Sequence, residues 1–231
     1  MFTGIVEETG TVNSISRNGN SLQLEINCSF AGELTEGESV AVNGTCLTVT
    51  KKTKNSFCAD VTPESFRRTS LGSLESGSEV NLARAMKADG RFGGHIVSGH
   101  IDGTGIFLGG VNEGNAVNIS VSVPAKIGKY IIEKGSVCID GISLTVAEVT
   151  ERENGGEVFF TVAVIPHTWE NTTLCKKSTG AVVNIECDVV GKYIEHFLSF
   201  NGGKNDSDDE KKNQEEDEVL LEAMTNFTSF H

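Results

Sequence analysis

The chain has 231 residues, a formal net charge of −13, 26 glycines and three prolines, and 38% of its residues are hydrophobic. The acidic balance argues against a nucleic-acid partner, because binding to a phosphate backbone normally needs a basic face. No apolar run approaches the ~20 residues of a membrane span, so no membrane partner is expected. Abundant glycine and short runs of Val, Ile and Thr favour strands and tight turns over long helices.

The six cysteines form no C-x-x-C pair, and the chain is too long for a small domain stapled by disulfides. The first ten residues, MFTGIVEETG, lack the basic and apolar regions of a secretory signal. We therefore expect a reducing compartment, the cytoplasm, with buried free cysteines. A plastid stays open as an alternative, in case a transit peptide was removed before Met1.

Three segments of the first half recur in the second half in the same order. Residues 3–12 resemble 98–107, residues 37–49 resemble 134–146, and residues 61–85 resemble 164–188, at offsets of 95, 97 and 103 residues. The offset drifts by only a few residues, as loop insertions would cause. The sequence therefore predicts one module present twice.

Each copy shows β-branched alternation interrupted by Asn-Gly, Gly-Asn and Ser-Gly turn signals, which predicts six strands per copy. The predicted strands are 3–12, 21–28, 39–42, 45–51, 56–62 and 79–84, and then 98–108, 116–123, 136–139, 142–150, 157–165 and 181–187. Asn43-Gly44 and Asp140-Gly141 occupy matching hairpin positions. Because closure removes exposed sheet edges, we expect an all-β chain of two tandem homologous six-stranded Greek-key barrels, at residues 1–94 and 95–190.

Helical signals are few. Thr62-Pro63-Glu64 predicts a capped turn of helix, and Pro124 to Tyr130 predicts another in the second copy. Residues 191–200 predict a C-terminal helix with an apolar stripe. The stripe consists of Tyr193, Ile194, Phe197, Leu198 and Phe200. It could pack on its own barrel or form an oligomer contact.

Residues 201–231 carry nine acidic and three basic side chains and few apolar ones. Such a segment cannot bury enough surface to order itself, so we predict a disordered acidic tail. Its end, VLLEAMTNF, could alternatively form a helical turn or dock on a partner.

Neither metal nor nucleotide signatures are present. His95 and His100 are five residues apart, which on a strand directs the two rings to opposite faces, and no cysteine lies near them. The sequence contains no G-x-x-x-x-G-K-[ST] loop, no strand–G-x-G-x-x-G–helix unit and no G-x-S-x-G elbow. A zinc site and a phosphate cradle are therefore not expected.

Polar side chains instead recur at matching positions of the two copies. Strand alternation places Cys46, Thr48 and Thr50 on one face, and Ser143 and Thr145 on one face. Hydroxyl and thiol groups inside or at the mouth of a small barrel could hydrogen-bond a polar heterocycle. The alternative is that they satisfy local backbone groups. The full matched set is Ser39, Asn43, Thr45, Cys46, Thr48 and Thr50, and Ser136, Asp140, Ser143, Thr145 and Glu148.

Six segments together resemble the riboflavin synthase family, the α-type enzymes with two barrels. They are MFTGIV, VNGTCLTV, GGHIVSGHIDGTG, KYIIEKG, IDGISLTV and NIECDVVGKYIEHF, in that order. The resemblance runs from Met1 to about Phe200 and includes the duplication, so it is specific.

The resemblance implies a reaction between two identical molecules. One 6,7-dimethyl-8-ribityllumazine donates a four-carbon unit to another, giving riboflavin and 5-amino-6-ribitylamino-2,4-pyrimidinedione, without metal or organic cofactor. It implies a homotrimer whose active sites form between the first barrel of one subunit and the second barrel of its neighbour. Helix 191–200 would hold the subunits together, and lumazine synthase is left open as a protein partner.

The resemblance also implies the site residues. His100 would carry protons, since histidine titrates near neutrality. Ser143 and Cys46 would add to the electrophilic carbon or orient water toward it, and Asp188 would polarise Ser143 or belong to a proton relay. The substrate-binding set would be Phe2, Thr3, Gly4, Ser39, Thr48, Glu64, Ser65, Lys134, Thr145, Ile165, His167 and Thr168.

One position departs from the family pattern. His167 stands where the first copy has Glu64 and where family members often carry an acid, which puts binding at the second barrel in question.

Two other functions remain open on the sequence. One is a non-catalytic lumazine- or flavin-binding protein of the optical antenna type, and the other is a structural module. The joint presence of Cys46, His100, Ser143 and Asp188 favours the enzyme.

Overall fold

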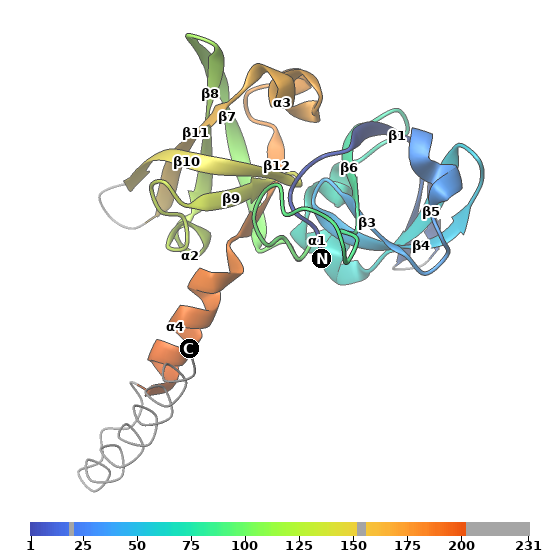
Figure 1. Ribbon diagram of the computed structural model, residues 1–231, viewed down its shortest axis with the longest axis horizontal. Helices are drawn as coiled ribbons and strands as arrows, with labels where there is room; N and C mark the ends of the chain where they lie inside the picture. Colours follow the sequence, from blue (N-terminus) through green and yellow to red (C-terminus); the bar gives the residue numbers. More distant parts are fainter. Residues whose placement is uncertain (19–20, 152–155, 202–231) are drawn as a thin grey trace, which may run out of the picture. The chain divides into compact units, whose positions relative to one another are not determined.

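The computed structural model describes residues 1–18, 21–151 and 156–201 (Figure 1). Twelve strands in these residues form two closed barrels, and both barrels belong to one compact unit, Met1–Gly191. All strand pairs are antiparallel. The predicted fold class of two six-stranded β-barrels is confirmed.

The two barrels have the same strand order. The first closes as β1-β2-β5-β4-β3-β6 and the second in the equivalent order β7-β8-β11-β10-β9-β12. The strands of the first barrel are β1 (Glu8–Asn18), β2 (Ser21–Asn27), β3 (Ser39–Val42), β4 (Thr45–Lys52), β5 (Ser56–Val61) and β6 (Glu79–Arg84). Those of the second are β7 (Gly103–Glu113), β8 (Ala116–Pro124), β9 (Ser136–Ile139), β10 (Ile142–Glu151), β11 (Glu157–Val164) and β12 (Val182–Cys187).

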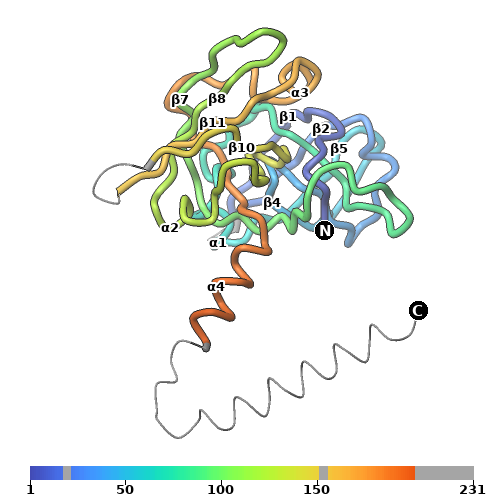
Figure 2. The backbone as a smooth tube through the Cα atoms, turned by 60° about the vertical axis from the view of Figure 1, so that its left-hand side comes forward, coloured from blue at the N-terminus to red at the C-terminus, as the bar shows by residue number. Residues whose placement is uncertain are grey.

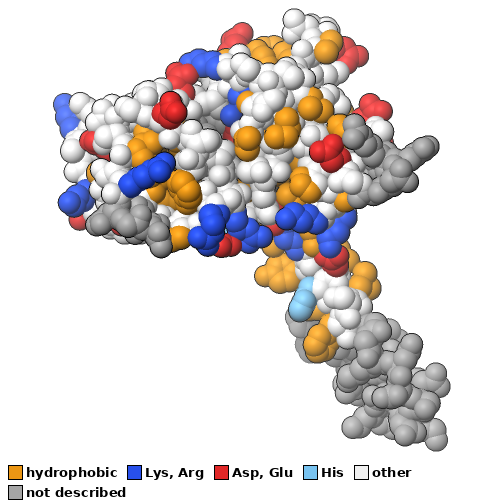
Figure 3. All heavy atoms as spheres, turned by 180° about the vertical axis from the view of Figure 1, so that it is seen from behind, with side chains coloured by type: hydrophobic (Ala, Val, Ile, Leu, Met, Phe, Trp, Pro, Cys, Tyr) orange, Lys and Arg blue, Asp and Glu red, His pale blue; other side chains and the backbone are white. Residues whose placement is uncertain are grey.

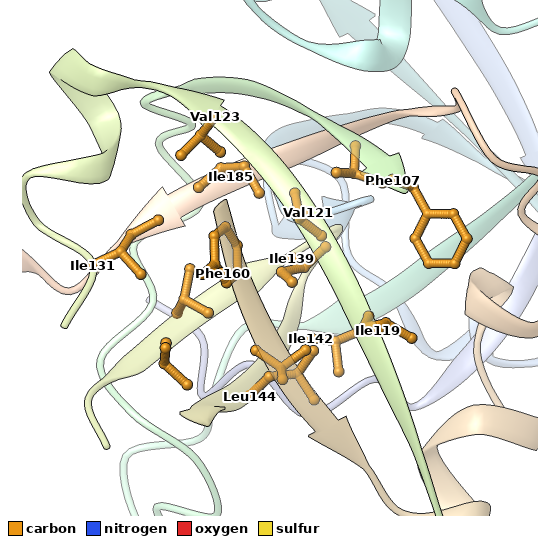
Figure 4. Close-up of a cluster of buried hydrophobic side chains, with 14 of the residues drawn as sticks. Phe107, Ile119, Val121, Val123, Ile131, Ile139, Ile142, Leu144, Phe160 and Ile185 are labelled. Carbon is orange, nitrogen blue, oxygen red and sulfur yellow. The ribbon is translucent and has the colours of Figure 1, made fainter. Parts of the chain in front are cut away.

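Alternation along the strands fills each barrel with apolar side chains. In the second barrel Phe107, Ile119, Val121, Ile139 and Phe160 point into a common core (Figure 4). The first barrel has an equivalent core around Leu24, Ile26 and Phe57. The interior of each barrel is therefore a packed apolar core.

The first strand of each copy differs from its prediction. β1 begins at Glu8 and β7 at Gly103, five residues after the predicted starts. Gly4 and Gly99 adopt positive φ angles of 74° and 84°, which end the extended conformation before each strand. The residues before each strand therefore leave their barrel, although their apolar alternation resembles that of a strand.

Short helices connect the strands. α1 (Pro63–Arg68) has the predicted cap, since the Thr62 side chain accepts a hydrogen bond from the Ser65 amide. The remaining ones are α2 (Ala125–Gly128), α3 (Pro166–Glu170) and the 3-10 turns η1 (Ser29–Glu33), η2 (Ser70–Ser73) and η3 (Thr173–Lys176).

A C-terminal helix, α4 (Val189–Asn201), covers the predicted segment 191–200. Tyr193 and Phe197 stack on it with ring centroids 6.3 Å apart. The predicted disordered tail and the VLLEAMTNF segment lie outside the described residues. No helix in the described ranges has the length and apolar character needed to cross a membrane.

Surface charge is unevenly distributed. The face shown in Figure 3 carries lysine and arginine side chains next to exposed hydrophobic ones. Although the net charge of the chain is negative, this face of the molecule therefore carries a group of positive side chains.

Two reciprocal hairpin turns join the barrels. Asn43 and Asp140 have φ angles of 43° and 45°, each followed by a glycine of positive φ, as in type I′ turns. The Asn184 side chain donates to the Asn43 carbonyl at 2.8 Å, and the Asn81 side chain donates to the Asp140 carbonyl at 2.9 Å. A Cβ on Gly44 would lie 2.7 Å from the amide nitrogen of Gly141. The predicted hairpins are thus also the contact between the two copies.

One buried ion pair breaks this symmetry. Asp140 is 0% exposed, and its carboxylate lies 2.7 Å from the Lys177 ammonium group. Burial raises the pKa of Asp140, and the charge of Lys177 lowers it in part. The first copy has Asn43 and Leu74 at the matching positions, so it has no charged pair there.

Candidate functional site

The first polar face lies on the outer surface of β3 and β4. Ser39 pairs with Thr48 and Ala41 pairs with Cys46, so these side chains share one face. The alternate residues, such as Leu47, point into the barrel core. Of the two predicted positions, inside the barrel or at its mouth, the inside is wrong, because apolar side chains fill it.

The second polar face has the same register. Ser136 pairs with Thr145 and Cys138 pairs with Ser143 across β9 and β10. Ser143 therefore stands where the first face has Cys46, and Thr145 stands where it has Thr48. Both faces carry one nucleophilic side chain and one threonine, as the repeat predicts.

A segment from before the second barrel lies across the first face. We call residues 97–100 the second crossing segment. The Cys46 amide donates to the Gly99 carbonyl at 2.9 Å. A Cβ on Gly99 would lie only 2.6 Å from the Cβ of Cys46, so this contact requires glycine.

The start of the chain lies across the second face in the same way. We call residues 2–4 the first crossing segment. The Ser143 amide donates to the Gly4 carbonyl at 2.7 Å, and a Cβ on Gly4 would lie 2.6 Å from that of Ser143. Each face is therefore completed by residues that precede the first strand of the other barrel.

The two crossing segments also pair with each other. The Phe2 amide donates to the Val97 carbonyl at 2.7 Å, and the Val97 amide donates back at 3.2 Å (Figure 2). Phe2 is 1% exposed and packs with Ala41, Ala83 and Cys138 in a small third core between the barrels. Its ring also packs close to Gly99, since a Cβ on Gly99 would lie 3.0 Å from the Phe2 Cε2 atom.

His95 is the side chain that meets Ser143. Its Nδ1 atom lies 2.7 Å from the Ser143 Oγ atom, and the residue is 9% exposed. Burial lowers the pKa of His95, and the nearby Asp188 carboxylate raises it in part. His95 is therefore largely neutral at neutral pH, and a neutral imidazole can accept the hydroxyl proton at Nδ1.

Sequence reasoning assigned no role to His95. The residue lies outside the three segments that recur in the two copies, so the repeat did not single it out. Its Nε2 atom is buried and has no hydrogen-bond partner within the described part of the chain.

His100, by contrast, lies on the segment that crosses the first face. It follows Gly99 on the second crossing segment, is exposed, and donates its amide hydrogen to the Ser98 hydroxyl at 3.2 Å. Asp188 accepts from the Val190 amide at 2.9 Å at the start of α4. The structure thus places Asp188 near His95, and places His100 next to Gly99, whose carbonyl bonds the Cys46 amide.

The remaining predicted binding residues of the first copy lie on α1. Glu64 is exposed and pairs with Arg67 at 3.4 Å and Arg68 at 3.1 Å. Ser65 is half-buried, and its amide is bonded to the cap residue Thr62.

The remaining predicted residues of the second copy lie at two places. Ile165 caps α3, and His167 and Thr168 are in its first turn, with His167 exposed. Lys134 is exposed in a turn with a φ of 62°, where the first copy has Gly37. A non-glycine residue in this conformation is strained, and such strain is frequent at functional sites.

Some members of the matched polar set have structural partners. The Thr50 hydroxyl donates to the Cys58 carbonyl at 3.2 Å, as the local alternative predicts. Asn43 and Asp140 form the reciprocal turns. Within the described residues, no group of three or more His, Cys, Asp or Glu side chains is arranged to hold a metal ion.

Comparison with protein families identifies both modules. The model of the lumazine binding domain matches residues 3–85 and again residues 98–188. Each match includes one polar face and all but the first residue of the crossing segment that comes before its own barrel.

Curated relatives match most of the chain. Riboflavin synthase of Bacillus subtilis (strain 168) is 47% identical over 199 residues, which are 86% of this chain and 90% of the relative. Riboflavin synthase of Actinobacillus pleuropneumoniae is 48% identical over 214 residues, 92% of this chain and 95% of the relative.

Solved structures share the fold. The crystal structure of LumP complexed with 6,7-dimethyl-8-(1'-D-ribityl) lumazine has a TM-score of 0.70 at 22% identity and covers 81% of this chain and 99% of that chain. The riboflavin complex of LumP has a TM-score of 0.71 at 23% identity, with the same coverage.

Proposed function

This chain belongs to the riboflavin synthase family, and we propose that it catalyses the dismutation of two 6,7-dimethyl-8-ribityllumazine molecules. One molecule transfers four carbons to the other, giving riboflavin and 5-amino-6-ribitylamino-2,4-pyrimidinedione. The observation that carries this proposal is the pair of matched outer faces, each with a nucleophilic side chain beneath a crossing segment. A reaction between two copies of one molecule calls for two similar binding surfaces.

The second face supplies the better-defined chemical pair. Ser143 donates its hydroxyl hydrogen to neutral His95, which makes the oxygen more nucleophilic toward C7 of a bound lumazine or toward a water that attacks it. Asp188 stabilises the imidazolium that forms when His95 takes the proton. The 2.7 Å contact of His95 with Ser143 supports this assignment.

The first face supplies the other half of the reaction. His100, exposed beside the Cys46 contact, removes a proton from the acidic 7-methyl group of the molecule bound there. Thr48 and Ser39 hydrogen-bond its heterocycle, and Cys46 orients its ring. Their common face supports this assignment.

The two faces of one reaction centre come from two subunits of a homotrimer in this proposal. Both faces lie on the outside of their barrels, where a second copy of the chain can reach them. Helix α4 would contribute its aromatic side chains to the assembly. The six cysteines are free, which supports a reducing compartment such as the cytoplasm.

Product formation tests the activity. The purified chain incubated with 6,7-dimethyl-8-ribityllumazine should develop riboflavin fluorescence without added metal or cofactor. Tight binding of the lumazine without product would support the antenna function instead, and absence of both would support a structural module.

Subunit complementation tests the shared site. One variant carries Cys46→Ala with Thr48→Ala, and the other carries Ser143→Ala with Thr145→Ala. Each alone should be inactive, whereas co-expressed variants should recover about a quarter of the activity, because a quarter of adjacent pairs in random trimers keep both faces intact. An inactive mixture that is shown to form hetero-oligomers would place both faces of a site in one chain.

A further inference from the structure

Glu186 is a buried carboxylate that the chemistry above does not use. It lies on β12, is 2% exposed, and accepts three hydrogen bonds from the second crossing segment. The Ser98 amide donates at 2.7 Å, the Ser98 hydroxyl at 2.6 Å and the Gly99 amide at 3.0 Å. Hydrogen bonds to a charged acceptor are roughly twice as strong as those between neutral groups.

The segment that Glu186 holds belongs to the first face. The Gly99 carbonyl bonds the Cys46 amide, and the Ser98 hydroxyl, itself bound to Glu186, also accepts from the His100 amide at 3.2 Å. One carboxylate of the second barrel therefore helps to fix the backbone of Gly99 directly. Through the Ser98 hydroxyl it also helps to fix the amide of His100.

The first copy has no such group. Ala83 pairs with Ala41 on β6 as Glu186 pairs with Cys138 on β12. Among the residues that the structure describes, the first crossing segment has backbone hydrogen bonds to Val97, to the His95 amide at 3.2 Å and to the Ser143 amide, and no hydrogen bond to a carboxylate. A carboxylate therefore holds one crossing segment and not the other.

We propose that Glu186 is a positioning residue that fixes the second crossing segment over Cys46 and so sets the position of His100 in the first face. Without it, the segment would keep only its bonds to Cys46 and Phe2. The inference rests on the proposed function for its effect on catalysis, but its structural part is independent of it.

Alkylation of Cys46 measures the structural part directly. In the full chain, Glu186→Gln keeps the side-chain volume and removes the charge, and iodoacetamide labelling is followed peptide by peptide. Labelling of Cys46 relative to the exposed Cys175 should become about tenfold faster, as expected for the loss of a charge-assisted hydrogen bond. Glu25→Gln is the matched control, because Glu25 accepts from Asn13, Ser14 and Ser56 and does not contact the segment.

A double-mutant cycle separates positioning from general destabilisation. Ser98→Ala should speed the labelling of Cys46 by itself, and should add little in the Glu186→Gln background, because both changes break the same contact. Additive effects, or a Cys46 labelling rate in Glu186→Gln equal to that of the Glu25→Gln control, would overturn the proposal.

Turnover measures the catalytic part. Glu186→Gln should lower kcat for riboflavin formation about tenfold with a smaller change in KM, because a misplaced His100 affects the reaction more than binding. Unchanged kcat together with faster labelling would refute the link from the segment to His100. If the unmodified chain forms no riboflavin, the proposed function fails, while the labelling result still decides whether Glu186 holds the segment.

Discussion

The two barrels share strand order, strand register and the asparagine contacts at their junction, yet they differ in the groups that surround their reactive side chains. The first face has Cys46 beneath a crossing segment held by the buried Glu186. The second has Ser143 beside the buried His95, beneath the start of the chain. Apart from the Asp140–Lys177 pair, the turns that join the barrels are alike, whereas the parts that would contact substrate differ.

This difference fits a reaction in which two identical molecules play unequal roles. The donor and acceptor need surfaces of the same shape but different proton chemistry, and one side chain on each face can supply that difference. In our proposal, the Ser–His pair of one face and the exposed histidine beside the other meet this need without a change of fold.

The largest expected effect comes from the charged pair that only the second copy has. Lys177→Leu should reduce the free energy of unfolding by about 3 kcal/mol, because it leaves the Asp140 carboxylate buried without its partner. The deficit should grow as pH rises, since loss of Lys177 raises the pKa of Asp140 further and stability falls as that group ionises. Chemical denaturation at several pH values measures both.

The double variant Asp140→Asn with Lys177→Leu copies the first barrel and provides the control. It should regain most of the lost stability. If it is as unstable as Lys177→Leu alone, the buried charge is not the cause.

The next effect tests the close approach of a crossing segment. Gly99→Ala should lower turnover about 100-fold, because the added Cβ would overlap Cys46 and shift the segment by a fraction of an ångström or more. Gly77→Ala is the matched control, since Gly77 also has a positive φ, of 90°, but its Cβ would meet nothing within 4 Å. It should cost about 1 kcal/mol of stability and leave turnover unchanged. Equal turnover in the two variants would count against a close-packed first face.

A smaller effect concerns the strained turn of the second barrel. Lys134→Gly should raise the free energy of unfolding by about 1 kcal/mol, because glycine adopts the positive φ without strain. If the side chain binds substrate, KM should rise in the same variant. Increased stability with unchanged KM would assign Lys134 no part in binding.

The smallest effect is a shift along the pH axis. His95 must be neutral to accept the Ser143 proton, and burial lowers its pKa below the usual value of about 6.5. Activity should therefore fall only as pH drops below that value. Asp188→Asn removes a charge that raises the pKa of His95, so the acid limb of the kcat/KM profile should move to lower pH. A shift to higher pH would contradict the assignment, and Asn13→Asp provides a charge change remote from His95 as a control.

Much of the fold follows from the sequence, because alternation and turn residues act locally. β3, β6 and β9 have the predicted limits, and the turns at Asn43 and Asp140 form as expected. The alternation of Cys46 and Thr48 also placed them on one face. The apolar residues that alternate with them, such as Leu47, fill the barrel core and so leave Cys46 and Thr48 on the outer face.

The crossing segments and the partners of Ser143 and Ser98 could not be predicted, because they depend on long-range contacts that no local pattern encodes. The crossing segments alternate like strands, and only the positive φ of Gly4 and Gly99 turns them toward the opposite barrel. His95 contacts Ser143 across 48 residues, and Ser98 contacts Glu186 across 88 residues, with no spacing rule to link them. The family resemblance predicted other site residues, such as His100 and Asp188, but neither His95 nor Glu186.

The exchange of crossing segments has a consequence for how the protein is made. All strands of the first barrel are synthesised before those of the second. Its polar face is nevertheless crossed by the segment that contains Ser98, and Ser98 is bound by Glu186, which lies 88 residues later in the chain. The Asn43 turn similarly meets its partner Asn184 only 141 residues later. Folding of the first barrel can thus precede folding of the second, but the second crossing segment and the Asn43 turn reach these partners only after β12 has been synthesised.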